Sequence, residues 1–267
     1  MQLSQINIYT LKSTQAVALE EALVNQRGIA TDRRWALIGA DNATLTGRDF
    51  SQLLDLRVET NATGLNIYRA SELVHTVTLP TTDHSRIPIH IFSNSTTGLL
   101  ADEVTNQWFS DYLQTEARLV YMDDNSVRGL GEKYGGNETD SVSLADEGPI
   151  LLLSEASIAD LNSRLETPIT VAHFRPNLVV KDATAFAEDS WKRIRIGEAE
   201  FKAGRQCKRC VFTTIDPVTK EKNPNGEPLR TLNSYRKGPE GGVIFGQLLI
   251  PTKMGKIKIG DTIEVIE

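Results

Sequence analysis

The sequence predicts a β-rich α+β protein in two parts. Short runs of alternating apolar and polar residues, separated by turn residues, fill about the first ninety positions. Residues 96–114 then carry apolar side chains at helical spacing, and strand-type runs return after residue 150 around one further helix. A succession of short strands with few helices is typical of a layered or barrel-forming β protein rather than of a helical bundle.

The first strands are short and evenly spaced. Ile6 and Ile8 alternate with polar neighbours, and residues 34–38 form a β-type run that a glycine ends. Residues 65–68 and 74–79 follow at similar intervals. This spacing predicts an antiparallel barrel or sandwich for the N-terminal part.

The pattern changes after the first strands. Residues 96–114 are predicted to form an amphipathic helix, because their apolar side chains recur at helical spacing: Leu99, Leu100, Val104, Trp108, Tyr112 and Leu113. A polar segment over residues 122–148, which contains Gly129, Gly131, Gly135 and Gly136, follows. It is longer than a simple connection requires, and such loops are often functional or disordered.

The C-terminal part opens with a buried-type strand at residues 150–153. Ser154 is predicted to cap a helix whose apolar face carries Ile158, Leu161 and Leu165. The remaining strands are expected at residues 177–180, 191–203, 209–215, 243–250 and 256–266, with a turn at Gly260-Asp261.

The composition excludes several classes of protein. The net charge of −6 argues against a general nucleic-acid binder, which needs a basic surface to displace counterions from phosphates. No apolar run approaches the roughly 18 residues of a membrane span, and the first residues do not read as a signal peptide. With only two cysteines, three positions apart, a disulfide scaffold is not expected, and we predict a reducing, cytoplasmic location.

Cys207 and Cys210 form the strongest local chemical signal. Three cationic neighbours, Arg205, Lys208 and Arg209, are expected to favour the thiolate. Four-cysteine iron–sulfur clusters are excluded by count, and a zinc site has too few nearby ligands. A thioredoxin-type pair usually opens a helix in a βαβ unit, whereas a β-type run follows here. One thiolate acting as ligand or nucleophile, and two buried inert thiols, both remain open.

Basic residues also recur beside predicted strand ends. They occur in Lys12-Ser13, Asp32-Arg33-Arg34, Thr46-Gly47-Arg48 and Arg175-Pro176-Asn177. An anionic ligand needs such donors, together with hydroxyls and backbone amides, to replace its lost water. Most basic residues on strands simply keep their charged ends in solvent, so the pattern alone leaves both interpretations open.

A string of segments in the chain resembles the MOSC-domain family in which a MOSC N-terminal β-barrel domain precedes the MOSC domain, and within it the amidoxime reducing components. The segments that carry the resemblance are YTLKS (9–13), TDRRWAL (31–37), TLTGRD (44–49), LLLSEASIADLNSRLE (151–166), HFRPNLVV (173–180), FAEDSW (186–191), CKRCVFTTIDP (207–217), EPLRTLNSYR (227–236), VIFGQ (243–247) and GKIKIGD (255–261). The resemblance implies an N-terminal β-barrel-like domain over residues 1–120 and a MOSC β-barrel domain with a few helices over residues 121–267.

The resemblance also implies a set of site residues. Cys210 would be the metal ligand and the catalytic residue of a molybdenum centre, with Cys207 a neighbour only. The phosphate-terminated molybdenum–molybdopterin cofactor would be bound by Lys12, Ser13, Arg33, Arg48, Arg175 and Asn177. Residues 145–148 match a cofactor-lining loop by position, and only their backbone is expected to take part.

The activity implied by the resemblance is a two-electron reduction of the N–O bond in amidoximes, hydroxylamines or N-hydroxylated nucleobases. Because the chain has no cysteines for a cluster of its own, electrons are expected from a separate partner: a ferredoxin, a flavoprotein or a cytochrome b5-like protein. No nucleic-acid or membrane partner is expected. Two other functions compete: a molybdenum cofactor carrier or sulfuration protein without substrate turnover, and a thiol redox protein that uses Cys207 and Cys210.

Overall fold

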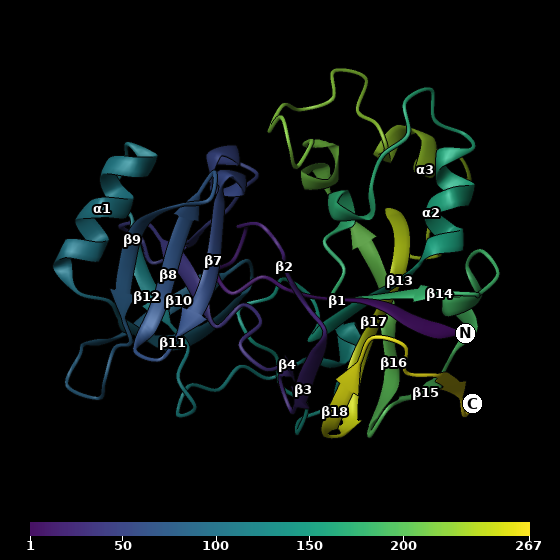
Figure 1. Ribbon diagram of the computed structural model, residues 1–267, viewed down its shortest axis with the longest axis horizontal. Helices are drawn as coiled ribbons and strands as arrows, with labels where there is room; N and C mark the ends of the chain where they lie inside the picture. Colours follow the sequence, from purple (N-terminus) through teal and green to yellow (C-terminus); the bar gives the residue numbers. More distant parts are fainter.

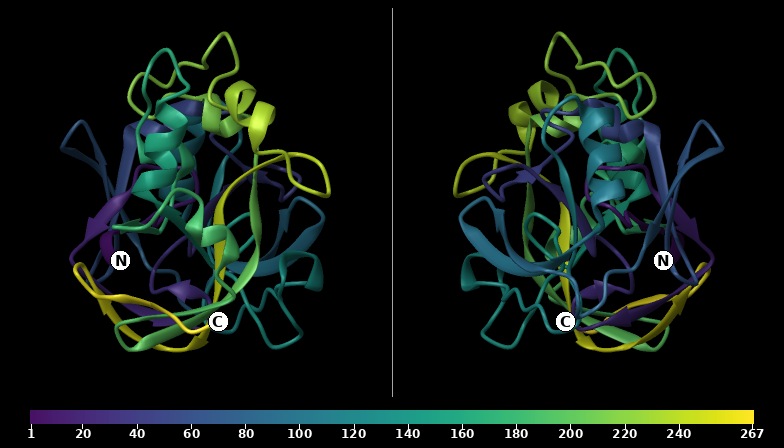
Figure 2. Two further views of the ribbon diagram at one scale, coloured as in Figure 1. Left: turned by 90° about the vertical axis from the view of Figure 1, so that its right-hand side faces the viewer. Right: turned by 90° about the vertical axis from the view of Figure 1, so that its left-hand side faces the viewer.

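The structure is a computed structural model that describes residues 1–267. Strands dominate it, and Figure 1 shows two lobes: one holds α1 with β7 to β12, and the other holds β1 and β13 to β18 with α2 and α3. The prediction of a β-rich α+β fold in two parts is confirmed. Both chain ends lie on the same lobe (Figure 2), where the backbone N–H of Ile263 donates to the carbonyl of Met1 at 3.1 Å.

An eight-stranded sheet forms the larger lobe. Its strands, in spatial order, are β19 (Ile263–Val265), β15 (Arg193–Ile196), β16 (Ala199–Arg209), β17 (Val243–Lys253), β13 (Ile150–Ser154), β14 (Leu178–Lys181), β1 (Gln2–Ile8) and β2 (Val17–Leu19). Only β13 and β14 are parallel, and α2 (Glu155–Asn162) lies between them in the chain. Leu3 and Ile6 of β1 lie in the same buried apolar cluster as Phe201 of β16, so both ends of the sequence build one core.

Three smaller sheets complete the fold. The first is β10 (Arg86–Ile91), β11 (Asn94–Leu100), β12 (Arg118–Tyr121), β5 (Trp35–Ile38) and β6 (Thr44–Leu45); the second is β7 (Leu56–Asn61), β8 (Gly64–Arg69) and β9 (Glu72–Thr78); the third is β18 (Gly255–Lys258), β3 (Glu21–Asn25) and β4 (Gly28–Ile29). Helix α1 (Glu103–Leu113) buries Phe109 and Leu113 in a core shared with the second sheet. Short 3-10 helices lie at Ser51–Asp55 (η1), Glu132–Tyr134 (η2), Val171–Phe174 (η3), Ala187–Ser190 (η4) and Val211–Thr214 (η5).

The division between residues 1–120 and 121–267 stays a prediction. Strands from both sides of that boundary share two of the sheets: β1 and β2 pair with the C-terminal strands, and β3 pairs with β18. The first thirty residues therefore join the two lobes through backbone hydrogen bonds.

The helix predicted over residues 96–114 is wrong in its first third. Residues 94–100 form β11, which pairs with β10, and α1 begins only at Glu103. Asp102 sets that start, because its side chain accepts a hydrogen bond from the backbone N–H of Thr105 at 2.7 Å. Leu99 and Leu100 therefore belong to β11. They were assigned to the helix because their positions fit the helical spacing of the apolar residues in α1.

Two strand predictions near the cysteines also need correction. The single strand expected over residues 191–203 is two strands, β15 and β16, because Gly197 adopts a left-handed φ of 54° in the turn between them. The strand expected over residues 209–215 is instead the end of β16 followed by η5. There the Thr213 and Thr214 hydroxyls donate to the carbonyls of Cys210 and Val211, and these local bonds override the β propensity of the run.

Other elements of the second half agree with the predictions. Ser154 caps α2 by accepting from the backbone N–H of Ser157 at 3.1 Å. The strands expected at residues 150–153, 177–180 and 243–250 are present as β13, β14 and β17. Helix α3 (Leu229–Tyr235) and the strands β2, β3, β4, β6, β7, β10, β11 and β12 were not predicted.

Candidate functional site

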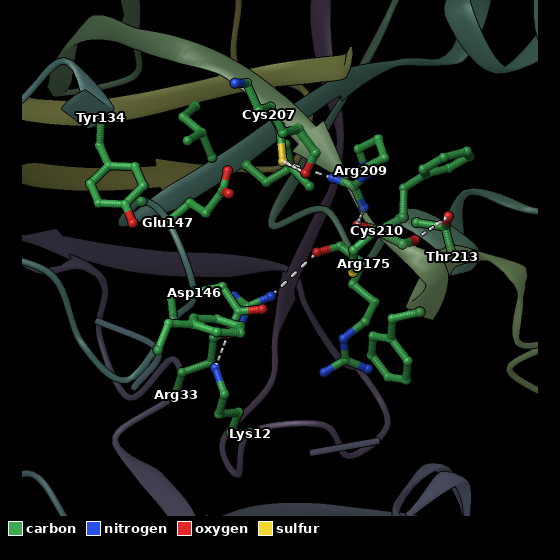
Figure 3. Close-up of a pocket in the computed structure, with 18 of the residues that line it drawn as sticks. Lys12, Arg33, Tyr134, Asp146, Glu147, Arg175, Cys207, Arg209, Cys210 and Thr213 are labelled. Atoms are coloured by element: carbon green, nitrogen blue, oxygen red, sulfur yellow. Dashed lines mark hydrogen bonds and ion pairs between the residues drawn. The ribbon is translucent and has the colours of Figure 1, made fainter. Parts of the chain in front are cut away.

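One pocket collects every residue that the sequence singled out for ligand binding. It has a volume of about 410 Å³ and is lined by 24 residues from both halves of the chain. The predicted site residues that line it are Lys12, Ser13, Arg33, Arg48, Arg175, Asn177 and Cys210. Figure 3 shows side chains from several strand ends and loops converging on this space.

Lys12 reaches the pocket from the segment after β1. Its backbone N–H donates to the carbonyl of Trp35, which fixes the segment beside β5. The side chain is buried; its Nζ donates to the carbonyl of Leu144 at 2.9 Å and to the carboxylate of Asp146. Burial lowers the pKa of Lys12, although the Asp146 carboxylate opposes that shift.

Asp146 holds two cations of the pocket together. One carboxylate oxygen accepts from Lys12, and the other accepts from Nη2 of Arg48 at 2.6 Å. Burial would raise the pKa of Asp146, but Lys12 and Arg48 outweigh it and hold that pKa well below its usual range. For Arg48, burial lowers the pKa, yet Asp146 and Cys210 together raise it above its ordinary value. The side chain of Asp146, and not only the backbone of residues 145–148, therefore lies in the site.

Arg33 and Arg175 form a second cationic pair around Tyr9. The guanidinium carbons lie 4.4 Å and 4.0 Å from the centroid of the Tyr9 ring. Nη1 of Arg33 donates to Asp32 at 2.6 Å, whereas Nη2 of Arg175 is buried and has no hydrogen-bond partner. Burial lowers the pKa of Arg175 to about 10. A buried cation with a free donor needs an anion or a polar ligand, so this pair favours an anionic occupant.

Strained backbone accompanies these cations. Ser13, Arg33 and Arg175 adopt φ values of 73°, 47° and 55°, in the left-handed region that side chains other than glycine rarely occupy. Such residues cluster where a ligand fixes the required geometry. Three of the seven predicted site residues therefore stand in conformations that packing alone does not favour.

The side chain of Asn177 makes hydrogen bonds within the protein. Its amide Nδ2 donates to the carbonyl of Asn7 at 3.0 Å, and its Oδ1 accepts from the backbone N–H of Leu151 and from Arg33. The side chain thus ties β1, β13 and Arg33 together at the floor of the pocket. It positions the neighbouring cation, and its role as a direct contact stays a prediction.

The two cysteines occupy different environments. Cys207 lies on β16 and is buried beside Leu151 and Leu248, with Nη1 of Arg209 donating to its sulfur at 2.9 Å. Burial raises the pKa of the Cys207 thiol, although Arg209 opposes that shift. Cys210 follows the end of the strand, is exposed, and accepts from Nη2 of Arg48 at 3.4 Å. Only Cys210 offers its sulfur to the pocket as an accessible thiol.

The expected effect of the neighbouring cations is present at Cys207, but burial outweighs it. Burial raises the pKa of the Cys207 thiol by more than Arg209 and Arg205 lower it. Arg205 also pairs with Glu147 at 2.6 Å, and Lys208 pairs with Glu240 at 3.2 Å. The cation beside Cys210 is Arg48, which is 162 positions away and was not linked to it by sequence. The argument against a thioredoxin-type pair now has a different basis. A short helix, η5, does follow Cys210, but β16 lies antiparallel to β15 and β17, so the pair is not part of a βαβ unit.

Several pocket residues had no recognisable sequence signal. Asp146 was expected to contribute only its backbone, because the partners of its side chain are 98 and 134 positions away. Phe92, Phe212 and His173 also line the pocket. His173 additionally lines a second, mostly polar cavity of about 680 Å³, and burial lowers the pKa of its imidazole.

The charge of the pocket wall is opposite to that of the chain. Seven cationic side chains line it, namely Lys12, Arg33, Arg48, Lys133, Arg175, Lys208 and Arg209, against the two carboxylates Asp146 and Glu147. No group of three or more His, Cys, Asp or Glu side chains that could hold a metal ion is present. The site thus suits an anionic ligand that brings its own metal and takes one soft thiolate from the protein. The free donor of Arg175 and the exposed thiol of Cys210 fit an anionic cofactor that carries a soft metal.

No helix in the structure has the length and apolar character needed to cross a membrane.

Known proteins resemble the chain over nearly all of its length. Residues 1–116 match the family model described as MOSC N-terminal beta barrel domain, and residues 139–264 match the one described as MOSC domain. Mitochondrial amidoxime reducing component 2 of Bos taurus is 34% identical over 97% of this chain and 82% of its own length. Mitochondrial amidoxime-reducing component 1 of Homo sapiens is 31% identical over 98% of this chain and 82% of its own length.

Proposed function

The chain belongs to the MOSC-domain family that carries a MOSC N-terminal β-barrel domain, and on that premise we propose that it binds a molybdenum cofactor and reduces N-hydroxylated compounds. The substrates are amidoximes, hydroxylamines or N-hydroxylated nucleobases. The relatives named amidoxime reducing components support the reaction class, and the pocket supports the cofactor.

The position of Cys210 is the observation that carries the proposal. Its thiol is exposed in the wall of a pocket in which cationic side chains outnumber carboxylates seven to two, on a chain of net charge −6. An anionic cofactor gains from those charges, and a soft thiolate is the ligand that a soft transition metal prefers. Cys207 also lines the pocket, but its thiol is buried and has a raised pKa.

The remaining residues divide the binding work. Arg33 and Arg175, with the hydroxyl of Ser13, would hold the cofactor phosphate, and Lys12 would add positive charge to the same pocket. Arg48 fixes the sulfur of Cys210 through its 3.4 Å contact and is itself held by Asp146. When bound, the cofactor supplies two-electron redox chemistry at the metal. A contact such as that of Arg48 with the Cys210 sulfur orients the atom that binds the metal and tunes its donor strength.

The overall reaction is R–NHOH + 2 e⁻ + 2 H⁺ → R–NH₂ + H₂O. The chain's own contribution is to orient the substrate beside Cys210 and to exclude bulk water from the charged floor of the pocket. The proposed electron source is a separate donor protein, a ferredoxin, a flavoprotein or a cytochrome b5-like protein, since the two cysteines of the chain are too few for a four-cysteine iron–sulfur cluster. We place the protein in the cytoplasm.

A molybdenum cofactor carrier or sulfuration protein is the second candidate function. The same basic pocket and exposed thiol would serve a protein that binds the cofactor without substrate turnover. A thiol redox pair is less well supported, since Cys207 is buried in β16, which pairs with strands on both sides, and exposed Cys210 lies beyond the end of that strand.

Two measurements test the proposal in sequence. Elemental analysis of protein from a molybdenum-competent host is expected to find near-stoichiometric molybdenum, lost in Cys210→Ser and retained in Cys207→Ser. Equal loss in both variants, or no molybdenum in the wild type, contradicts the ligand assignment. Reduction of benzamidoxime to benzamidine with reduced methyl viologen then separates the two functions, because a loaded protein that reduces no N-hydroxylated compound is a carrier.

A further inference from the structure

Phe92 is the one aromatic side chain of the pocket wall that the fold leaves exposed. Its side chain is 66% exposed, whereas Tyr134 and Phe174 are buried and Phe212 is half-buried. Its strand neighbours Ile89 and Ile91 belong to a buried apolar cluster, but Phe92 does not. Packing of the core therefore gives no reason for an aromatic residue at this position.

The backbone at Phe92 is also unfavourable for its side chain. The pairing of Ile91 with Asn94 leaves Phe92 and Ser93 as the two-residue turn between β10 and β11. Phe92 has a φ of 52°, in the left-handed region where such hairpin turns favour glycine or asparagine. An exposed phenylalanine in this conformation lowers the stability of the fold, and strained residues of this kind cluster at ligand sites.

The ring of Phe92 stands beside the reacting centre. The guanidinium carbon of Arg48 lies 5.2 Å from the ring centroid, and the same guanidinium donates to the sulfur of Cys210 at 3.4 Å and to Asp146 at 2.6 Å. One fixed cation thus separates the ring from the proposed metal ligand. The turn is further tied to the opposite rim, because Nζ of Lys133 lies 3.5 Å from the hydroxyl of Ser93.

We propose that Phe92 determines substrate specificity by stacking on a planar aromatic or heteroaromatic group of the substrate while the N–O group faces Cys210. This inference rests on the proposed reductase function and names the substrate class that the site prefers. Aromatic faces stack on any planar π system, and Phe92 presents the most exposed aromatic face of a wall whose other aromatic rings, Tyr134, Phe174 and Phe212, are buried or half-buried. The protein therefore discriminates for aryl amidoximes and hydroxylamino-bases, and against small aliphatic N-hydroxylated compounds.

The test compares benzamidoxime with acetamidoxime, which share the reacting group and differ in the ring. Equilibrium dialysis uses molybdenum-loaded, oxidised protein, in which no turnover occurs without an electron source. We expect Phe92→Ala to raise the Kd of benzamidoxime about tenfold and to leave that of acetamidoxime within about twofold. Phe92→Trp restores the discrimination, and Phe92→Leu, which keeps apolar bulk without a ring, stays close to the alanine variant. Val104→Ala, an exposed apolar residue on α1 outside the pocket, is the control and changes neither constant.

Turnover with reduced methyl viologen provides the second readout. The KM for benzamidoxime is expected to rise with the Kd in Phe92→Ala, while kcat stays within about twofold, because stacking is uniform binding away from the N–O bond. Equal changes for both substrates, no change, or full activity of Phe92→Leu overturns the proposal. An effect that appears only with a protein electron donor also overturns it, since Phe92 would then be a docking contact.

The two proposals fail separately. Loaded wild-type protein that binds benzamidoxime in a Phe92-dependent manner without reducing it contradicts the reductase function and supports the stacking role. Loaded protein that reduces both amidoximes equally well in wild type and Phe92→Ala supports the reductase function and refutes the stacking role.

Discussion

Asp146 provides a sharp test of the electrostatics of the pocket. Its carboxylate is the only counter-charge that Lys12 contacts, and it also accepts from Arg48 at 2.6 Å. Asp146→Asn keeps the shape and one acceptor but removes the negative charge. Lys12, whose side chain is only 6% exposed, is then left with the carbonyl of Leu144 at 2.9 Å as its principal partner.

The expected cost follows from the burial of the two partners. Breaking a fully buried ion pair costs about 3–5 kcal/mol, because it leaves an uncompensated charge. Asp146 is 32% exposed, so solvent screens part of the interaction, and Lys12 can escape the penalty by losing its proton. We therefore expect cofactor-free Asp146→Asn to be less stable by about 2 kcal/mol, which lowers the Tm by about 4–8 °C.

Asp124→Asn is the matched control. Asp124 pairs with Arg34 at 2.9 Å, but its side chain is 95% exposed, and such surface pairs contribute about 0–1 kcal/mol. Urea unfolding of wild type and both variants measures the difference at neutral pH. If the two substitutions cost the same, or if Asp146→Asn costs less than about 0.5 kcal/mol, the pairing of Lys12 with Asp146 does not have the role assigned here.

The stability difference between wild type and Asp146→Asn should also depend on pH, in a direction set by the pKa shifts of Asp146 and Lys12. The folded pKa of Asp146 lies below its unfolded value of about 4, so its stabilisation is complete above that value and is lost as the pH falls through the folded pKa. The folded pKa of Lys12 is lowered, and it falls further when Asp146 no longer raises it. A base with a lowered folded pKa destabilises the fold while protonated, so the variant recovers as the pH rises towards about 10. The gap between wild type and Asp146→Asn is therefore largest near neutral pH, and a gap independent of pH contradicts this account.

Two further predictions concern the shape and the thiols of the site. A Cβ at Gly47 would lie 2.6 Å from the Phe212 ring, so Gly47→Ala displaces that ring and is expected to lower the free energy of unfolding in urea by about 1–3 kcal/mol. Gly129→Ala is the control, because a Cβ there has nothing within 4 Å, and it should change that free energy by less than about 0.5 kcal/mol. Equal losses in the two variants would contradict the contact. Iodoacetamide is expected to alkylate exposed Cys210 and to spare buried Cys207 in native cofactor-free protein, as measured by peptide mass spectrometry, and bound cofactor should protect Cys210; preferential labelling of Cys207 would refute the assignment.

The sequence predicted the strands whose side chains face one core. The alternation of apolar and polar residues in β1 and the apolar run of β13 depend on local burial, and both were found where expected. Propensity failed where tertiary contacts decided the conformation. Residues 211–214 are rich in β-branched and aromatic side chains, yet hydroxyl-to-carbonyl bonds turn them into a 3-10 helix.

The sequence predicted most of the binding residues of the pocket, but not the contacts between them. Its resemblance to a family supplied seven residues, and all seven line one pocket. It did not supply Asp146, because a carboxylate that bridges partners 98 and 134 positions away leaves no local spacing to read. For the same reason it missed the cation beside Cys210. Arg209 contacts Cys207, as neighbours in the chain can, but Arg205 and Lys208 pair with Glu147 and Glu240, and the distant Arg48 contacts Cys210.

What the sequence determined by itself is the β-rich class, the positions of several strands, the helix that Ser154 caps, and the residue types that favour an anionic ligand and a thiolate. Alternation and capping are local properties that survive in one dimension. Only the tertiary structure decided which thiol is accessible and which cation lies beside it. It also placed the exposed ring of Phe92 against the Arg48 guanidinium that contacts the Cys210 sulfur. Burial and Coulomb interactions depend on distances in space, and the sheets that set those distances join segments more than a hundred residues apart.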